Sequence, residues 1–540
     1  MDRILMNGHL VTMDPLYPRA EAVAISGGRI AAVGNSQEML SLKTGKTVVM
    51  DLQGKTVVPG FNDSHLHLLS FGLSLERFEC SGFKSVDALV EGGRRHLEQH
   101  RIPPGEWLLG RGWNSLALNE RRDLNCHDLD RISTRHPICL TRICGHAAAV
   151  NTRGMELAGI SRETPHPPGG HIDRDATGEP LGLFRENARH LIHAHIPEPT
   201  PDQIKSALVK AGDVCAGYGI TSVQTDDFEA VAGNDYRQVL QAYQELSRER
   251  KLSVRVYEQC LLPEMERLNA FLKEGWCTGV GDDYFRIGPL KLLTDGSLGA
   301  RTAYLSEPYA DDPGNRGIAV FSQEELNRLV VTAHRAGMQI ALHAIGDAAM
   351  EMCFHSFEEA QRQCFREDPR FGIIHLQITT EPLLRQFAGT GVIAFAEPVC
   401  LGNDLHMVEA RLGKERAAKT YNYRRLIDDG VPVCLSSDSP VDSLNPMVNL
   451  HAAVTRQDET GIPHGGWLPE QRLTLDQALM GLTVGSAYAS FEEKHKGSMK
   501  SGMMADLAVL SRDPYGVLSE ELKDIQVETT FMDGRIVFQR

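Results

Sequence analysis

Short apolar runs alternate with longer helical stretches through the middle of the chain. Eight runs are predicted to be strands because they are short, largely apolar and often β-branched, as strands buried on both faces should be. They cover residues 57–61, 219–224, 252–257, 285–293, 338–342, 372–375, 392–396 and 431–436. Helical stretches lie between or after them, at 201–216, 323–336 and 471–489. Eight strand–helix units predict an α/β fold of the (β/α)8 TIM barrel type.

Both ends of the chain show a different pattern of short β-like runs separated by turn signals. Asn7-Gly8 and Gly27-Gly28 separate the runs near the N-terminus, and Asp533-Gly534 does so near the C-terminus. The runs cover residues 3–6, 9–12, 22–25, 29–33, 505–510, 527–532 and 535–538. We therefore expect a small β-sandwich-like domain built from both termini, with a barrel between them. The expected domain ranges are 1–58 with 498–540, and 59–497.

The spacing of the predicted strands is uneven. Strands two to eight fit into about 220 residues, a normal length for this fold. The stretch between strands one and two, about 68–218, is far too long for a βα loop. We expect a large insertion after strand one, above the end of the barrel where active sites of this fold lie.

Composition narrows the classes of protein that fit. The 540 residues carry a formal charge of -15, which disfavours a nucleic-acid partner. No apolar run approaches the ~18 residues of a membrane span, and the N-terminus lacks a secretory signal pattern. The 11 cysteines include no C-x-x-C pair. We expect a cytoplasmic enzyme with a small-molecule substrate and no membrane partner, and leave open whether it forms a homo-oligomer.

The strongest local motif is His65-Leu66-His67 at the end of the first predicted strand. Side chains in a strand alternate with period two, so both imidazoles point to the same side and can chelate one ion. An H-x-H motif alone is weak evidence, because it also occurs by chance. Its position at a strand end strengthens the prediction of a metal site.

Three further ligand-type residues follow later predicted strands. His343 follows the fifth strand, His375 ends the sixth, and Asp438 comes shortly after the eighth. Each also has a plain alternative, since either histidine could be hydrogen-bonded in the core and Asp438 could cap a helix. Their shared position at one end of a barrel favours a single metal site.

Lys291 lies inside the apolar fourth strand. A free ammonium is costly to bury, so the plain alternative is a lysine that reaches solvent or an ion pair. The functional alternative is a lysine of lowered pKa that adds carbon dioxide. The resulting carbamate is an anion that can bridge two divalent metals.

In this order along the strands, the H-x-H pair, lysine, two histidines and aspartate resemble the amidohydrolase superfamily. The resemblance extends to its YtcJ-like branch, which includes N-substituted formamide deformylases. The matching stretches are 58–67, 294–299, 342–347, 437–441, 502–507 and, within the insertion, 145–147, Asn151 and 182–186. One departure is Glu397-Pro398 after strand seven, where the resemblance leads us to expect Gln-Pro. It does not affect an expected ligand position.

The resemblance implies a divalent metal centre held by six residues: His65, His67, Lys291, His343, His375 and Asp438. The first two would bind the more buried ion, and a carboxylated Lys291 would bridge to a second ion held by the other histidines. Asp438 would bind metal and act as general base toward water. The ligand types favour zinc, and iron, manganese or nickel also fit. The implied activity is hydrolysis of a carbon–nitrogen bond in a non-peptide amide or N-formyl compound.

Candidate substrate contacts are Trp113 and His146 in the insertion and Arg301 beyond strand four. An arginine near a metal could bind a substrate carboxylate. The alternatives are packing for Trp113, a core histidine for His146 and a surface ion pair for Arg301.

Two other functions stay open. One is a deaminase with a single metal and an unmodified Lys291. The other is a regulatory barrel protein that has lost catalysis, although all six ligand positions carry suitable side chains. The number of ions per chain separates the two enzymes, and the sequence does not identify the substrate.

Overall fold

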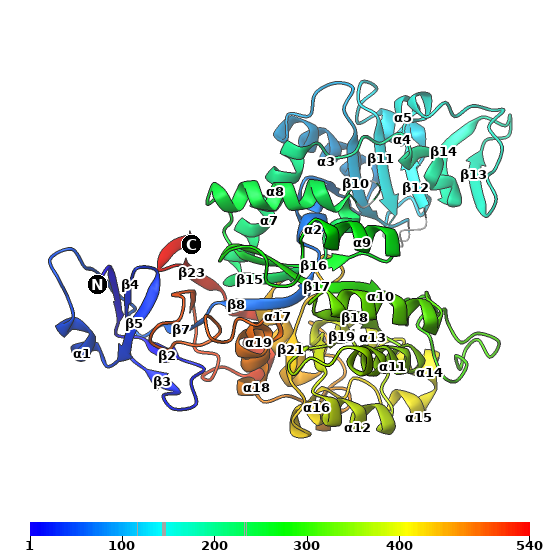
Figure 1. The fold of residues 1–540 in the computed structure, drawn as a ribbon. Coiled ribbons are helices and arrows are strands. Elements are labelled where there is room, and N and C mark those ends of the chain that lie inside the picture. The colour runs from blue at the N-terminus through cyan, green and yellow to red at the C-terminus, as the bar shows by residue number, and fades with distance from the viewer. Residues whose placement is uncertain (116, 143–146, 232, 234) are drawn as a thin grey trace. The chain divides into compact units, whose positions relative to one another are not determined.

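The computed structural model describes residues 1–115, 117–142, 147–231, 233 and 235–540 (Figure 1). The described chain divides into two compact units. One contains residues 1–72 and 204–540, and the other contains residues 73–203. The predicted domain boundaries are not tested by this division and stay a prediction.

An eight-stranded parallel sheet forms the centre of the larger unit. Its strands pair in chain order from first to last: β8 (Phe61–Leu66), β15 (Ile220–Thr225), β16 (Arg255–Leu261), β17 (Phe285–Leu293), β18 (Ile340–Ala344), β19 (Gly372–His375), β20 (Ile393–Ala396) and β21 (Val433–Leu435). The two outermost strands also meet, because Asp438 N donates to His65 O at 2.9 Å and Ser437 N donates to Asp63 Oδ1 at 3.1 Å. The predicted α/β TIM barrel is confirmed.

The position predicted for the first barrel strand was wrong. Residues 57–61 mostly form β7 (Thr56–Pro59), which pairs with β2 (His9–Val11) and β22 (Leu507–Leu510) in another sheet. The chain changes sheets at Gly60, where a Cβ atom would lie 2.1 Å from Thr221 Oγ1. Only glycine permits so close an approach. The barrel strand therefore begins at Phe61, four residues after the predicted start, and His65 lies within it.

Helices follow most barrel strands and cover the outside of the sheet. Local capping explains where several begin: Ser322 and Glu325 form a capping box at one helix, and Asn445 caps another whose first residue is Pro446. The longer helices of this unit are α7 (Pro201–Gly217), α8 (Tyr236–Arg248), α9 (Met265–Lys273), α10 (Gln323–Arg335), α11 (Asp347–Gln363), α12 (Glu381–Thr390) and α17 (Pro446–Thr455). Shorter ones are α2 (Leu68–Leu75), α16 (Tyr423–Asp428), α18 (Leu475–Met480) and α19 (Ser486–Ala489).

This unit contains two further sheets. One is built from N-terminal strands, and the other combines strands from both ends of the chain, blue and red in Figure 1. The four-stranded sheet has the order β5-β4-β1-β6, and the six-stranded sheet has the order β24-β23-β22-β7-β2-β3. Their remaining strands are β1 (Arg3–Met6), β3 (Arg19–Ala20), β4 (Ala22–Ser26), β5 (Arg29–Gly34), β6 (Val48–Asp51), β23 (Val527–Met532) and β24 (Arg535–Gln539). Leu5, Val23, Val57 and Leu507 belong to one buried cluster, so both termini share a core.

The smaller unit has a mixed six-stranded sheet with the order β13-β14-β12-β11-β10-β9. The strands are β9 (Phe78–Glu79), β10 (Leu108–Trp113), β11 (Ile138–Arg142), β12 (Ala147–Val150), β13 (Gly170–Arg174) and β14 (Pro180–Glu186), and the helices include α3 (Val86–Gln99), α4 (Cys126–Asp130) and α5 (Thr152–Leu157). It has its own hydrophobic cluster, which includes Trp113. Within the described residues, no helix has the length and apolar character needed to cross a membrane.

Candidate metal centre

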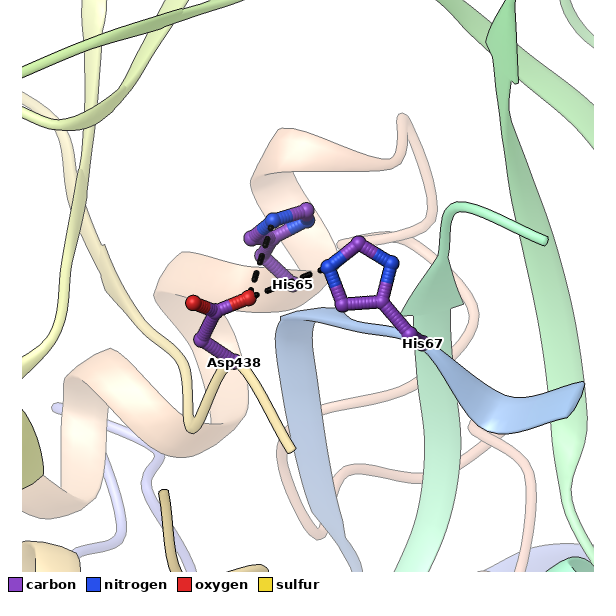
Figure 2. Close-up of side chains that lie close together, drawn as sticks. All are labelled: His65, His67 and Asp438. Atoms are coloured by element: carbon purple, nitrogen blue, oxygen red, sulfur yellow. Dashed lines mark ion pairs between the residues drawn. The ribbon is translucent and has the colours of Figure 1, made fainter. Parts of the chain in front are cut away.

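His65, His67 and Asp438 converge at the end of the barrel to which the parallel strands point (Figure 2). The Nε2 atoms of His65 and His67 lie 3.5 and 3.2 Å from Asp438 Oδ1. Asp438 has a φ of 54°, which lies in the left-handed region. This conformation is unfavourable for any residue other than glycine. Its backbone N–H donates to His65 O, which fixes this conformation against the first strand.

Lys291 comes from the fourth barrel strand and is 1% exposed. The side chain of Lys291 is buried in the barrel, and its Nζ atom lies 3.1 Å from His65 Nε2. Burial lowers the pKa of Lys291, while the negative charges of Asp226 and Asp438 act in the opposite direction. The expected lysine is therefore buried beside an expected histidine ligand.

His343 and His375 approach the same place from β18 and β19. Their ring centroids are 4.3 Å apart, and the centroid of His375 is 5.6 Å from that of His65. His343 Nε2 lies 3.2 Å from Gly296 O and 3.3 Å from Asp295 Oδ1. The structure thus brings all six expected ligand side chains to one end of the barrel.

Several polar partners of these residues were not predicted from the sequence. Gln259 Oε1 lies 2.7 Å from His65 Nδ1, Asp226 O lies 2.9 Å from His67 Nδ1, and Glu397 Oε2 lies 2.6 Å from His375 Nδ1. Buried partners of this kind orient metal-ligating histidines. Polar residues within or just after apolar strands are the signal that could have identified Gln259 and Glu397.

The arrangement fits a divalent cation. Asp438 Oδ1 is buried and accepts no hydrogen bond from the described residues. Ligand atoms about 2.1 Å from a tetrahedral ion lie about 3.4 Å from one another, close to the separations between Asp438 and the two histidines. A second group of side chains has suitably close ligand atoms, namely His65, His375 and Glu397.

Burial dominates the electrostatics of the centre. It lowers the pKa of His65 and of His375 well below the usual value, and the nearby cationic groups lower both further. Burial also acts to lower the pKa of His67, but the close contact with Asp438 and the charge of Asp226 outweigh it and raise that pKa to about 9. Two histidines are thus held neutral, the form that binds metal.

The expected substrate contacts have different surroundings. Trp113 is buried in the smaller unit and its Nε1 donates to Leu140 O at 2.8 Å. Arg301 makes a two-bond ion pair with Asp311, with Nε and Nη2 at 3.0 and 2.8 Å from its oxygens. His146 lies outside the described residues. Substrate binding by any of these three stays a prediction.

Enzymes with a (β/α)8 barrel carry their active-site residues at the carboxyl ends of the strands. The histidines, lysine and aspartate of this barrel lie there, which is the arrangement of a barrel enzyme. The chain matches the Amidohydrolase family over residues 48–538. It therefore belongs to the amidohydrolase family and is a hydrolase, which confirms the resemblance seen in the sequence.

Similar proteins cover the whole chain. YtcJ of Bacillus subtilis (strain 168), whose name assigns it to the amidohydrolases, is 33% identical to this chain over 542 residues. The alignment covers 100% of both proteins. The N-substituted formamide deformylase of Arthrobacter pascens is 28% identical, over 100% of this chain and 98% of that protein. The crystal structure of an uncharacterized metal-dependent hydrolase from Pyrococcus horikoshii superposes with a TM-score of 0.78 at 30% identity, over 96% of this chain and 99% of that one.

Proposed function

We propose that this protein is a metal-dependent hydrolase that cleaves a carbon–nitrogen bond in a small non-peptide amide or N-formyl compound. The observation that carries the proposal is the convergence of His65 and His67 on one oxygen of Asp438, with Lys291 Nζ 3.1 Å from His65. The similarity to a protein named as a formamide deformylase supports the bond type.

In this proposal His65, His67, His343 and His375 offer imidazole nitrogens to zinc or another divalent ion. When bound, such an ion lowers the pKa of a water molecule and polarises a carbonyl group. Asp438 accepts the proton of the attacking water on Oδ1 and passes it to the leaving nitrogen. Lys291, if its amine adds carbon dioxide, contributes a carbamate anion between two ions.

A single-metal deaminase is the second candidate. The group formed by His65, His67 and Asp438 favours it, because three protein ligands with one open position suffice for a catalytic ion. In that case Lys291 keeps its free amine. Near two ions per chain supports the first candidate, and one ion supports the second.

The test combines metal analysis with a substrate screen. Purified protein should contain a transition metal and hydrolyse at least one compound in a panel of formamides, amides, esters and lactones. Protein grown with ¹³C-bicarbonate should show a carbamate signal by NMR that Lys291→Met removes. Lys496→Met is a matched control, since Lys496 is also buried but pairs with Glu492 at 2.6 Å. A metal-free, inactive wild-type protein would refute the proposed function.

A further inference from the structure

Glu397 follows strand β20 and is buried against the candidate metal centre, with 2% exposure. Its Oε2 atom lies 2.6 Å from His375 Nδ1, the distance of a strong hydrogen bond. Ser436 Oγ lies 3.4 Å from the other oxygen. The carboxylate therefore has one close partner, and that partner is an expected metal ligand.

We propose that Glu397 is a positioning residue of the metal centre: by accepting a hydrogen bond from His375 Nδ1–H, it keeps His375 Nε2 free to bind an ion. The proposal rests on the proposed metal-dependent function. A neutral imidazole has one protonated nitrogen and one lone pair, so the partner of one nitrogen decides what the other can bind. A carboxylate on Nδ1 also makes Nε2 a stronger ligand.

The backbone around His375 supplies a second argument. His375 has a φ of 77° and Leu376 a φ of 39°, so two successive residues with side chains occupy the left-handed region. Such a conformation persists only when surrounding contacts hold it. The hydrogen bond from His375 to Glu397 joins this turn to the end of the neighbouring strand β20 and fixes the direction of the ring.

Charge distinguishes glutamate from glutamine, the residue that the resemblance leads us to expect here. A glutamine oxygen could also accept from His375 Nδ1–H and hold the same tautomer. Burial, followed by the charge of Asp438, raises the pKa of Glu397 in the metal-free protein, whereas bound cations favour the ionised form; once metal is bound, the carboxylate adds a negative charge near the histidines. This charge strengthens the hydrogen bond and offsets part of the charge of bound cations. The glutamate should therefore raise metal affinity beyond what orientation alone provides.

The test compares metal affinity in Glu397→Gln, Glu397→Leu and the wild type. Each protein is stripped with a chelator and titrated with Co²⁺, with affinity from chelator competition and ligand geometry from the visible spectrum. We expect affinity to fall about 10-fold in the glutamine variant and about 100-fold in the leucine variant, the range seen for such partners. The Co²⁺ spectrum should change most in Glu397→Leu.

The control is Glu492→Gln, which removes another buried carboxylate, one paired with Lys496 rather than with a histidine. It should bind Co²⁺ like the wild type. Wild-type affinity and spectrum in both Glu397 variants would overturn the positioning role and leave the proposed function intact. A wild-type protein that binds no transition metal would refute the proposed function and the positioning role together. Thermal unfolding checks that each variant is folded, and Glu397→Gln, with its retained shape, keeps the test informative if the leucine variant unfolds.

Discussion

The two ends of the barrel both bury charged side chains, but they balance them differently. At the amino end of the strands, Arg255 begins β16 and is 2% exposed. Its Nε and Nη2 atoms lie 2.7 and 3.0 Å from the two oxygens of Asp506, and Nη2 also bonds Asp533. The charges of Asp506 and Asp533 outweigh the effect of burial and raise the pKa of Arg255. One cation is thus held by two anions and kept charged.

At the carboxyl end, four histidines and Lys291 lie among carboxylates that include Asp226, Glu397 and Asp438. Here burial and mutual repulsion lower the pKa of His65 and His375, and Asp438 Oδ1 accepts no hydrogen bond from the described part of the chain. Neutral imidazoles and a carboxylate oxygen without a donor offer lone pairs that a bound cation can accept. Buried charges therefore pair with one another at the amino end, whereas at the carboxyl end they leave ligand atoms free, as the proposed metal site requires.

The largest expected effect is loss of activity in Asp438→Asn. The amide cannot accept the proton of water, so kcat/KM on a substrate from the screen should fall by a factor of about 10² to 10⁴. The midpoint of urea unfolding of the metal-free protein should change little at pH 9.5, where His67 of the wild type has lost most of its proton. The control is Asp506→Asn at the amino end of the strands, where the opposite result is expected. This variant should unfold at a lower urea concentration and keep its activity per folded molecule. Activity retained in Asp438→Asn would contradict a catalytic role at this end.

Arg255→Met should cause the largest loss of stability. It leaves the buried Asp506 without its cation and the half-buried Asp533 without its closest one, a change that costs about 3 to 5 kcal/mol. Unfolding by urea, followed by circular dichroism, measures the loss. The metal content of the folded fraction should stay at the wild-type level. If Arg255→Met instead removed metal without changing stability, the division of roles between the two ends would be wrong.

A smaller effect concerns the pH dependence of the metal-free protein. The pKa of His67 is raised to about 9 from 6.5, so the folded state holds this proton more tightly than the unfolded chain does. The stabilisation is fully present below pH 6.5 and is lost as the pH rises through 9. Burial raises the pKa of Asp63 to about 7 and of Asp226 to about 6, so these carboxyls lose most of their protons at lower pH.

We therefore expect the chelator-treated protein to lose roughly 2 kcal/mol of stability between pH 7.5 and 9.5. Urea unfolding across this range measures it. In Asp438→Asn, which removes the carboxylate that raises the pKa of His67, the loss should be much smaller. Equal losses in both proteins would assign the pH dependence to other groups.

Much of the barrel could be predicted from the sequence, because buried parallel strands are short apolar runs and ligand-type residues follow them directly. Residues 285–293 and 372–375 were predicted with the bounds that the structure gives. The first strand was misplaced because the apolar run at 57–59 continues into Phe61, and only the three-dimensional contact at Gly60 separates two sheets.

The immediate partners of the site were harder to predict. The sequence around Gln259 does not indicate that its side chain contacts His65, because the two residues are 194 positions apart. In the sequence, Glu397 stands out only as a departure from the expected Gln-Pro, outside the expected ligand positions. The structure instead brings it to His375. Such contacts depend on the register between neighbouring strands, which periodicity does not determine.

The smallest expected effect belongs to Arg301→Gln. Arg301 is about one-third exposed and pairs with Asp311, which also accepts from Arg411. An exposed ion pair of this kind contributes little to stability, so the urea midpoint and the metal content should hardly change. If the guanidinium also binds substrate, KM should rise for substrates that carry a carboxylate and stay constant for their neutral analogues. If the variant and the wild type have the same KM for both kinds of substrate, Arg301 only forms a surface ion pair. It then belongs neither to the buried ion pairs at the amino end nor to the site at the carboxyl end.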